Sequence, residues 1–393
     1  MAVSSGSEAP TTAPWRDPRV RAAFFQTLVL VLAAAFIIWI VNNTLNNLAR
    51  LNIASGYDFL GRRAGFGVPM NLVDYSPDSS YRRAFGVGIL NTLLVSVMGI
   101  IASTMIGFVM GVARLSTNWL IRTVAAVYVE GLRNVPMLLQ IFFWYFAVLG
   151  ALPQPRQAMN IAGSAFLSNR GLYLPAPVPE AGFWLTPIVF LLSIAAVIML
   201  VFWARRRRER TGQIFPTGKV SIAVLILPAV LTWIATGAPL GWDFPSLQGF
   251  RFVGGMTVVP ELAAVWFALS MYTGAFIAEA VRGGILAVSK GQTQAARSLG
   301  LSPGQTLRLV IIPQAMRIIV PPVTNQYLSL TKNSSLGAAV GYPELMSVSG
   351  TMLNQTGQAV EVLGITMLVY GFICLVIALI MNVYNRLVRI PER

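Results

Sequence analysis

The chain has 393 residues, of which 55% are hydrophobic and only 11% charged, so too few polar side chains are present to cover a soluble domain of this length. It contains no histidine and one cysteine, Cys374, which excludes an internal disulfide and catalysis by a Ser/His or Cys/His pair. The net charge is +15, but Lys and Arg are scattered between apolar runs and form no stripe, so nucleic acid is not an expected partner.

Apolar runs long enough to cross a membrane recur along the chain. A helix needs roughly 20 apolar residues to cross a hydrocarbon core about 30 Å thick, where open backbone groups find no water. About eight stretches meet this length, so the expected class is an all-α, polytopic protein of the lipid bilayer. They lie at residues 24–41, 86–113, 124–149, 183–203, 220–234, 262–278, 312–336 and 362–384.

The basic residues orient these spans. Cytoplasmic connections are enriched in Lys and Arg, and placing both termini in the cytoplasm puts the arginine-rich run at residues 205–210 and most other basic residues there. The first apolar run is longer than the core of about 7 to 15 residues typical of a signal peptide, so we expect it to be retained as a span. The exported stretch that follows it is the exception to the charge rule, with Arg50, Arg62, Arg63, Arg82 and Arg83.

The cytoplasmic connection at residues 282–313 carries signals for a short helix. Ser289 followed three residues later by Gln292 has the spacing of a capping box, which predicts a helix start. Residues 292–299 suit a short helix, and Gly300 predicts that it ends in a left-handed conformation.

A second start signal follows at once. Ser302 and Gln305 again have capping-box spacing, and Pro303 fits the first position of a helix. The chain is thus expected to display a short helix between two spans. Its small residues Ala295 and Ala296 would let a partner surface approach closely, although spacing alone also fits an ordinary helical hairpin.

This connection resembles the EAA loop of binding-protein-dependent ABC importer permeases. In that family Glu-Ala-Ala is followed at fixed spacing by Gly and then by Ile, any residue, Leu and Pro. The matching residues in this chain are Gln294, Ala295, Ala296, Gly300, Val310, Ile312 and Pro313. Gln294 replaces the acidic residue, so no salt bridge is expected there.

Further motifs resemble the polar amino-acid branch of the family, and they imply a five-helix type I ABC importer permease core in a bacterial inner membrane. The additional spans resemble those of the long permease subunit of general L-amino-acid uptake systems. The motifs are Asn-Thr-Leu at residues 91–93, Arg-Asn-Val-Pro at 133–136, Leu-Gln at 139–140, Pro-Gln-Ala at 313–315 and Lys-Asn-Ser-Ser-Leu at 332–336.

The resemblance implies a division of the chain into segments. The expected segments are a disordered cytoplasmic tail at 1–21, an extra span and periplasmic loop at 22–85, the first part of the permease core at 86–150, an insert with two spans at 151–260, and the second part of the core at 261–393, which includes the EAA coupling loop at 282–313.

The energy source is expected on another chain. No G-x-x-x-x-G-K-[ST] phosphate-binding loop occurs, because the only Gly-Lys pair, Gly218 and Lys219, is followed by Val220. The resemblance implies that a separate ABC ATPase binds ATP and Mg²⁺, and that this chain has no catalytic residue, metal or cofactor of its own. It also implies a periplasmic amino-acid-binding protein and a second permease subunit, either a related chain or a second copy.

The resemblance places the contact with the ATPase on the short helix of the loop, and we expect Ala296 to face that partner. Closure of the ATPase would then move the spans that carry the loop. The residues assigned to this contact are Gly291, Gln294, Ala295, Ala296, Leu299, Gly300 and Pro313.

Polar residues inside the spans are candidates for a substrate path, because a polar side chain in lipid is costly unless it is paired or wetted. The seventh span is the best candidate, since two adjacent prolines, Pro321 and Pro322, are expected to kink it. Hydrogen bonding between helices is the alternative for each residue. The candidates are Asn91, Gln140, Thr324, Asn325, Ser329 and Lys332.

Two i, i+3 pairs of opposite charge, Glu130 with Arg133 and Glu279 with Arg282, lie near cytoplasmic ends of spans and are expected to be structural ion pairs.

Three classes of function fit a polytopic protein. An ABC permease that moves polar or general L-amino acids from periplasm to cytoplasm by alternating access is favoured by the loop at 282–313. A stand-alone secondary transporter or channel is the alternative, although no pair of repeated halves is evident. A membrane enzyme is disfavoured because the spans hold no cluster of carboxylates.

Overall fold

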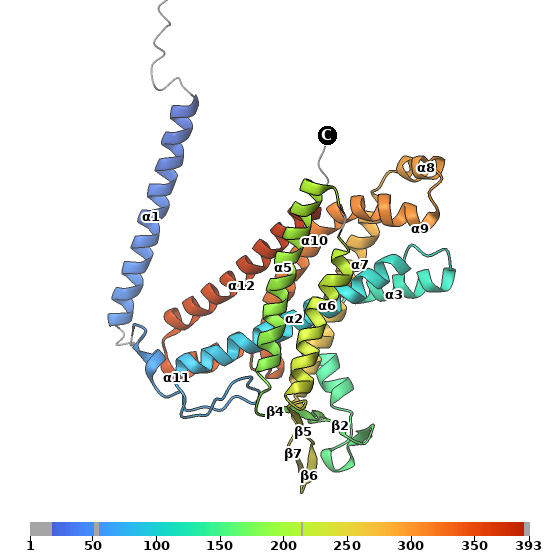
Figure 1. Cartoon of the computed structure of the whole chain (residues 1–393). Helices are drawn as coiled ribbons and strands as arrows, with labels where there is room; N and C mark the ends of the chain where they lie inside the picture. Colours follow the sequence, from blue (N-terminus) through green and yellow to red (C-terminus); the bar gives the residue numbers. More distant parts are fainter. Residues whose placement is uncertain (1–17, 51–54, 214, 389–393) are drawn as a thin grey trace, which may run out of the picture. The chain divides into compact units, whose positions relative to one another are not determined.

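The computed structural model describes residues 18–50, 55–213 and 215–388, and helices dominate it (Figure 1). The expected helical class is confirmed. The long helices are α1 (Pro18–Arg50), α2 (Tyr81–Ala113), α3 (Trp119–Asn134), α5 (Leu185–Thr211), α6 (Thr217–Ala235), α7 (Pro260–Leu286), α10 (Ile312–Asn333) and α12 (Ala359–Val388). The shorter ones are α4 (Met137–Phe142), α8 (Lys290–Ser298), α9 (Pro303–Thr306) and α11 (Leu345–Thr356), with 3-10 segments η2 (Asp58–Gly61), η4 (Pro155–Gln157) and η6 (Ser334–Val340) and π-helical segments η3 (Phe143–Leu149) and η5 (Leu307–Ile311).

Seven helical segments in the described residues are long and apolar enough to cross a membrane, and the bent pair formed by α3 with α4 and η3 makes an eighth if it is counted as one span. This agrees with the number of spans predicted. Most of the expected tail at residues 1–21 lies outside the described residues; its last four residues already belong to α1.

The third predicted span is not one straight helix, because α3 and α4 meet at an angle of 108°. Val135 is extended, with φ −98° and ψ 127°, and Pro136 follows it. A proline disfavours helical conformation in the residue before it and has no N–H to donate, which explains the break. Gln140 secures the corner, since its Nε2 donates to the carbonyls of Leu132 and Val135 at 2.9 and 3.0 Å.

Three small antiparallel sheets lie between η3 and α7, and the sequence analysis did not predict them. Strands of three or four residues are too short to show a clear alternation of apolar and polar side chains. In the largest sheet the order is β1 (Met159–Ile161), β2 (Ala165–Ser168), β3 (Gly171–Leu174), β8 (Met256–Val258). The other two sheets pair β4 (Ala176–Pro179) with β5 (Leu240–Asp243), and β6 (Ser246–Gln248) with β7 (Arg251–Val253).

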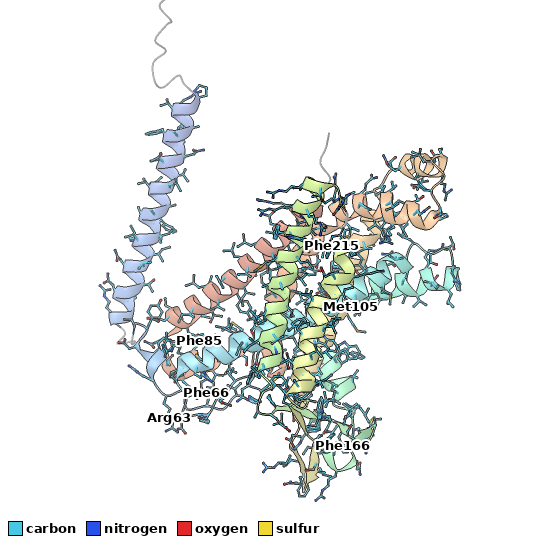
Figure 2. The ribbon with its side chains drawn as sticks, viewed as in Figure 1. Arg63, Phe66, Phe85, Met105, Phe166 and Phe215 are labelled. Carbon is cyan, nitrogen blue, oxygen red and sulfur yellow. The ribbon has the colours of Figure 1, made fainter. Side chains whose placement is uncertain are left out.

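Ring packing joins two of these sheets. The rings of Phe166 on β2 and Tyr173 on β3 lie 4.8 and 4.3 Å from the ring of Phe252 on β7 (Figure 2 labels Phe166). The helices α5 and α6, which lie between β4 and β5 in the chain, pack against each other as a hairpin (Figure 1). Their central windows are almost wholly exposed, as expected of helices that face lipid.

The described residues divide into two compact units, and each of α2 and α12 contributes to both. The first unit contains residues up to Leu90 together with Leu345–Ile373. Its core gathers aromatic and aliphatic side chains from the loop before α2, from α2 itself and from α11, including Phe59, Phe85 and Met352. The loop is held to the start of α12 by the Gly56 N–H, which donates to Glu361 Oε1 at 2.8 Å.

The second unit contains Asn91–Glu344 with the end of α12, and α7 is its most buried membrane helix. Glycines let neighbouring helices approach α7 closely. A Cβ at Gly111 of α2 would lie 2.7 Å from the carbonyl oxygen of Ala278, and Gly107 lies one turn earlier against Ile277. This Gly-x-x-x-Gly spacing is typical of close helix contacts in membranes.

Candidate functional site

The short helix predicted in the cytoplasmic loop is α8. Ser289 is its N-cap, and the Ser289 hydroxyl accepts from the Gly291 N–H at 3.2 Å. The predicted capping box is wrong, because the Ser289 hydroxyl does not accept from the Gln292 N–H. Gln292 Oε1 instead accepts from Gln314 Nε2 at 3.3 Å. This bond links the first turn of α8 to α10.

The end of α8 follows the prediction. Gly300 has φ +79°, and the Gly300 and Leu301 N–H groups donate to the carbonyls of Arg297 and Ala296. The next capping box is complete, with Ser302 and Gln305 each accepting from the other's N–H, at 3.3 and 2.9 Å. Two well-capped helices, α8 and α9, therefore form this part of the loop.

The loop residues differ in exposure. Ala296 is only 3% exposed and packs inside the loop, so the expectation that it faces a partner is wrong. Leu299 at the C-cap is 81% exposed. The remaining coupling candidates are exposed except Pro313, which is half-buried in the first turn of α10: Gly291, Gln294, Ala295 and Gly300.

The loop is carried by two helices that pack tightly on each other. α7 and α10 share a buried cluster that includes Ile277, Val281, Ile319 and Val323. Gly284 in the last turns of α7 lies directly against the Ile319 side chain. A movement of α8 would therefore be passed to both helices together.

The substrate-path candidates on α10 fall on two faces. Asn325, Ser329 and Lys332 follow the i, i+4, i+7 spacing of one helix face; Asn325 and Lys332 are exposed, and Ser329 is partly exposed. Thr324 turns back on its own helix, since its hydroxyl donates to the Val320 carbonyl at 2.9 Å. α10 runs unbroken through the two adjacent prolines.

Asn91 and Gln140 are buried. Asn91 Nδ2 donates to the Pro343 carbonyl at 2.8 Å, and the Tyr342 hydroxyl donates to the Asn91 carbonyl at 2.9 Å. Burial raises the pKa of Tyr342, which keeps the hydroxyl protonated as a donor. Gln140 closes the corner between α3 and α4, as described above. The amide nitrogens of both side chains bond inside the unit and both residues are buried, so the exposed face of α10 is the stronger candidate for a path.

The two predicted ion pairs have different outcomes. Arg282 and Glu279 pair as predicted, at 2.5 Å. Glu130 does not pair with Arg133 but with Arg114, at 3.3 Å, and the Arg133 guanidinium lies 4.9 Å from the ring centroid of Phe276. Arg114 also pairs with Glu279. Sequence reasoning missed Arg114, although its position directly after a long apolar run was a signal.

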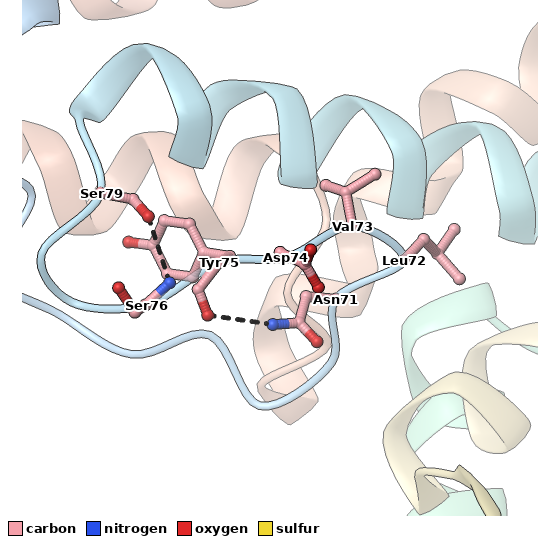
Figure 3. Close-up of a pocket in the computed structure, with 7 residues that line it drawn as sticks. All are labelled: Asn71, Leu72, Val73, Asp74, Tyr75, Ser76 and Ser79. Carbon is pink, nitrogen blue, oxygen red and sulfur yellow. Dashed lines mark hydrogen bonds between the residues drawn. The ribbon is translucent and has the colours of Figure 1, made fainter.

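An open cavity of about 430 Å³ lies on the loop before α2 (Figure 3). Its walls include Asn71, whose Nδ2 donates to the Tyr75 carbonyl at 3.4 Å, and Ser79, whose hydroxyl accepts from the Ser76 N–H at 3.2 Å. These bonds lie within the loop and none of the predicted site residues lines the cavity. The described part of the chain contains no group of three or more Cys, Asp or Glu side chains suited to a metal ion.

Membrane helices of this number define a multi-pass membrane protein, which displays a capped helix on the loop between two of them. Residues 183–389 match the family described as binding-protein-dependent transport system inner membrane component. The chain belongs to this family.

Relatives match almost the whole chain. YhdX of Escherichia coli (strain K12) is 51% identical over 383 residues, which cover 96% of both chains. The general L-amino acid transport system permease protein AapQ of Rhizobium johnstonii is 48% identical over 96% of this chain and 94% of its own. The glutamate/glutamine/aspartate/asparagine transport system permease protein BztB of Rhodobacter capsulatus is 40% identical over 96% of both chains.

Proposed function

We propose that this permease moves L-amino acids from the periplasm to the cytoplasm, driven by a separate ATPase that docks on α8. The observation that carries the proposal is the form of the loop. α8 is short and capped at both ends, it exposes Ala295 and Leu299, and it joins α7 to the segment leading into α10. A rigid element of this kind can transmit a movement of its partner to the membrane helices.

The choice of amino acids as substrate is supported by the relatives, whose names include a general L-amino acid system and a glutamate, glutamine, aspartate and asparagine system. Delivery by a binding protein is supported by the family's description. The proposal also includes a second permease subunit, either a related chain or a second copy. The basic run at the end of α5 supports a topology with both termini in the cytoplasm of a bacterial cell with an inner membrane.

The substrate path in this proposal includes the face of α10 formed by Asn325, Ser329 and Lys332. A charged side chain at membrane depth is stable only beside water, a partner charge or a polar ligand. The described residues place no carboxylate in an ion pair with Lys332. The Lys332 ammonium group is therefore suited to the carboxylate of an amino acid that passes along this face.

The test is transport by the purified complex in vesicles. Co-expressed permease, ATPase and binding protein are reconstituted, and uptake of labelled amino acids is measured with ATP supplied on the ATPase side. We expect uptake that requires both ATP and the loaded binding protein. Uptake without ATP that follows an imposed proton or sodium gradient would contradict the proposal and indicate a secondary transporter.

A further inference from the structure

Four charged side chains join three helices at one end of α7. Arg114 lies in the turn just after α2 and its side chain is only 15% exposed. Its guanidinium pairs with Glu279 of α7 and, through Nη2, with Glu130 of α3 at 3.3 Å. Arg282 holds the same carboxylate from one turn further along α7, with Nε 3.0 Å from Glu279 Oε2. Glu279 is thus shared between two arginines.

The contact between α2 and α7 beside this cluster is close. Gly107 and Gly111 bring the α2 backbone against Ile277 and Val281 of α7, and a Cβ at Gly274 of α7 would lie 3.0 Å from the Ile106 side chain of α2. Small residues allow this close apolar packing. The pair of Arg114 with Glu279 adds a directional, charge-assisted contact at the end of the interface.

The cluster lies close to the coupling loop along the chain. α7 continues for about two turns beyond Glu279, ends at Leu286, and is followed after a short connection by α8. Helix α7 has no break between Glu279 and its end. A displacement of α8 is therefore transmitted to Glu279 through the continuous end of helix α7.

Aromatic contacts on α3 complete the arrangement. The Arg133 guanidinium lies over the ring of Phe276, one turn before Glu279, and the Tyr128 hydroxyl donates to the Met271 carbonyl of α7 at 2.7 Å. These contacts hold α3 along α7, whereas the tie from α7 to the end of α2 passes through Arg114. Arg114 is the one side chain of the four-residue cluster that pairs with both α3, through Glu130, and α7, through Glu279.

We propose that Arg114 and Glu279 form an interhelical clamp that transmits movement of α8 from α7 to the α2–α3 hairpin. This inference rests on the proposed function, because it names the residues that carry the coupling away from the loop. Arg114 and Glu279 are positioning residues: neither touches the ATPase-facing helix α8 nor the face of α10 assigned to the path.

The clamp is tested with Arg114→Gln in the reconstituted complex with ATPase and binding protein. This change removes the link between helices but leaves Glu279 paired with Arg282. Glu130 loses its partner, but its carboxylate is 68% exposed and stays hydrated. Glu130→Gln is the matched control, because it removes the ion pair that Arg114 makes with α3, whose Glu130 side chain is largely exposed. Exposed ion pairs contribute little.

We expect Arg114→Gln to lower ATPase stimulation by the loaded binding protein, and uptake with it, by at least about fivefold, the lower range of allosteric coupling. Basal ATP hydrolysis and the amount of ATPase bound to the permease should match wild type, and Glu130→Gln should match wild type throughout. A merely structural role would lower assembly and basal activity as well.

Other outcomes overturn the clamp. Wild-type stimulation in Arg114→Gln would do so, as would equal losses in Arg114→Gln and Glu130→Gln. If Arg114→Gln fails to assemble, Glu279→Asp decides, since it keeps the charge and shortens the reach; full stimulation in that variant contradicts the clamp. Absence of stimulation in the wild-type complex itself would overturn the proposed function and the clamp together.

Discussion

Gly300 shows how one backbone conformation supports the coupling loop. Its φ of +79° is in the left-handed region, where residues with a Cβ pay about 1–2 kcal/mol. No other atom lies within 4 Å of a Cβ built at this position, so any effect of substitution comes from the backbone and not from a clash. A substitution of Gly300 therefore tests the effect of backbone conformation without a change in side-chain packing.

We predict that Gly300→Val uncouples ATP hydrolysis from uptake. A β-branched residue disfavours the left-handed end and would extend or redirect α8, whereas the membrane helices are untouched. The measurement is uptake and stimulated ATPase activity of the reconstituted complex. Gly300→Asn is the control, because asparagine tolerates this conformation, and it should retain most activity. Equal activity of the two variants and wild type would show that the end of α8 is not critical.

A second prediction concerns the exposed face of α10. Lys332→Ala and Asn325→Ala should each lower uptake, because they remove polar groups from the proposed path, while the complex still assembles. Thr324→Val is the matched control on α10: it removes only the hydroxyl that donates to the Val320 carbonyl, so uptake should stay near wild type. Uptake rates and subunit yields are compared. Unchanged uptake in both alanine variants would remove this face from the path.

At the scale of elements, the corner between α3 and α4 and the glycine contacts of α2 shape the second unit. The corner follows from Pro136, and Gln140 supplies donors for two carbonyls that the break exposes. In the glycine contact the missing side chains matter, because Gly107 and Gly111 let the backbones of α2 and α7 approach each other closely. The break at Pro136 and the glycine contact of α2 both determine where the helices that carry α8 can lie.

Gly111→Ala is predicted to destabilise the protein. The added methyl group would lie 2.7 Å from both the Ala278 carbonyl oxygen and the Val281 Cβ, so the two helices must separate, and overpacking of this kind costs about 1–3 kcal/mol. Thermal unfolding of the purified protein in detergent should show a lower midpoint. Gly131→Ala in α3 is the control, since nothing lies within 4 Å of its added methyl group. A drop of equal size in the unfolding midpoint of Gly131→Ala would show that the loss of stability comes from replacing glycine within a helix and not from a clash between helices.

At the scale of the whole molecule, membrane topology is the property that the charge pattern predicts. Arg207 lies in the last turns of α5 and Gln213 in the connection to α6, and their side chains bond to each other at 2.9 Å. A cluster of arginines beside a long apolar helix is expected to stay in the cytoplasm. The strands at the other end of the α5–α6 hairpin are then exported.

The topology prediction is that a reporter inserted within residues 205–219 is cytoplasmic and one inserted within residues 154–179 is exported. The pair is informative because α5 alone separates the two segments, so each insertion is the control for the other. Activity of a reporter that folds only after export, measured in whole cells, distinguishes them. Finding both insertions on the same side of the membrane would contradict the proposed orientation.

Features that depend on local chemistry were predictable from the sequence. Apolar length predicted the membrane spans, and serine, glutamine, proline and glycine at fixed spacing predicted the start of α8, its left-handed end and the complete capping box of α9. The break at Pro136 could also have been predicted, because the effect of proline on the preceding residue is local. The division of the chain into core and insert stays a prediction.

Tertiary contacts decided the rest, because a sequence shows spacing along a helix but not which neighbour lies across from it. Glu130 has a basic residue one turn away at Arg133, yet it pairs with Arg114 of another helix. Ala295 and Ala296 are alike in sequence, and only packing within the loop buries Ala296. The strand β8 pairs with β3, which is distant along the chain. The sequence by itself determined a helical membrane permease with a short capped helix on the loop at residues 282–313; the tertiary structure decided which charges join its helices and which side chains the loop presents.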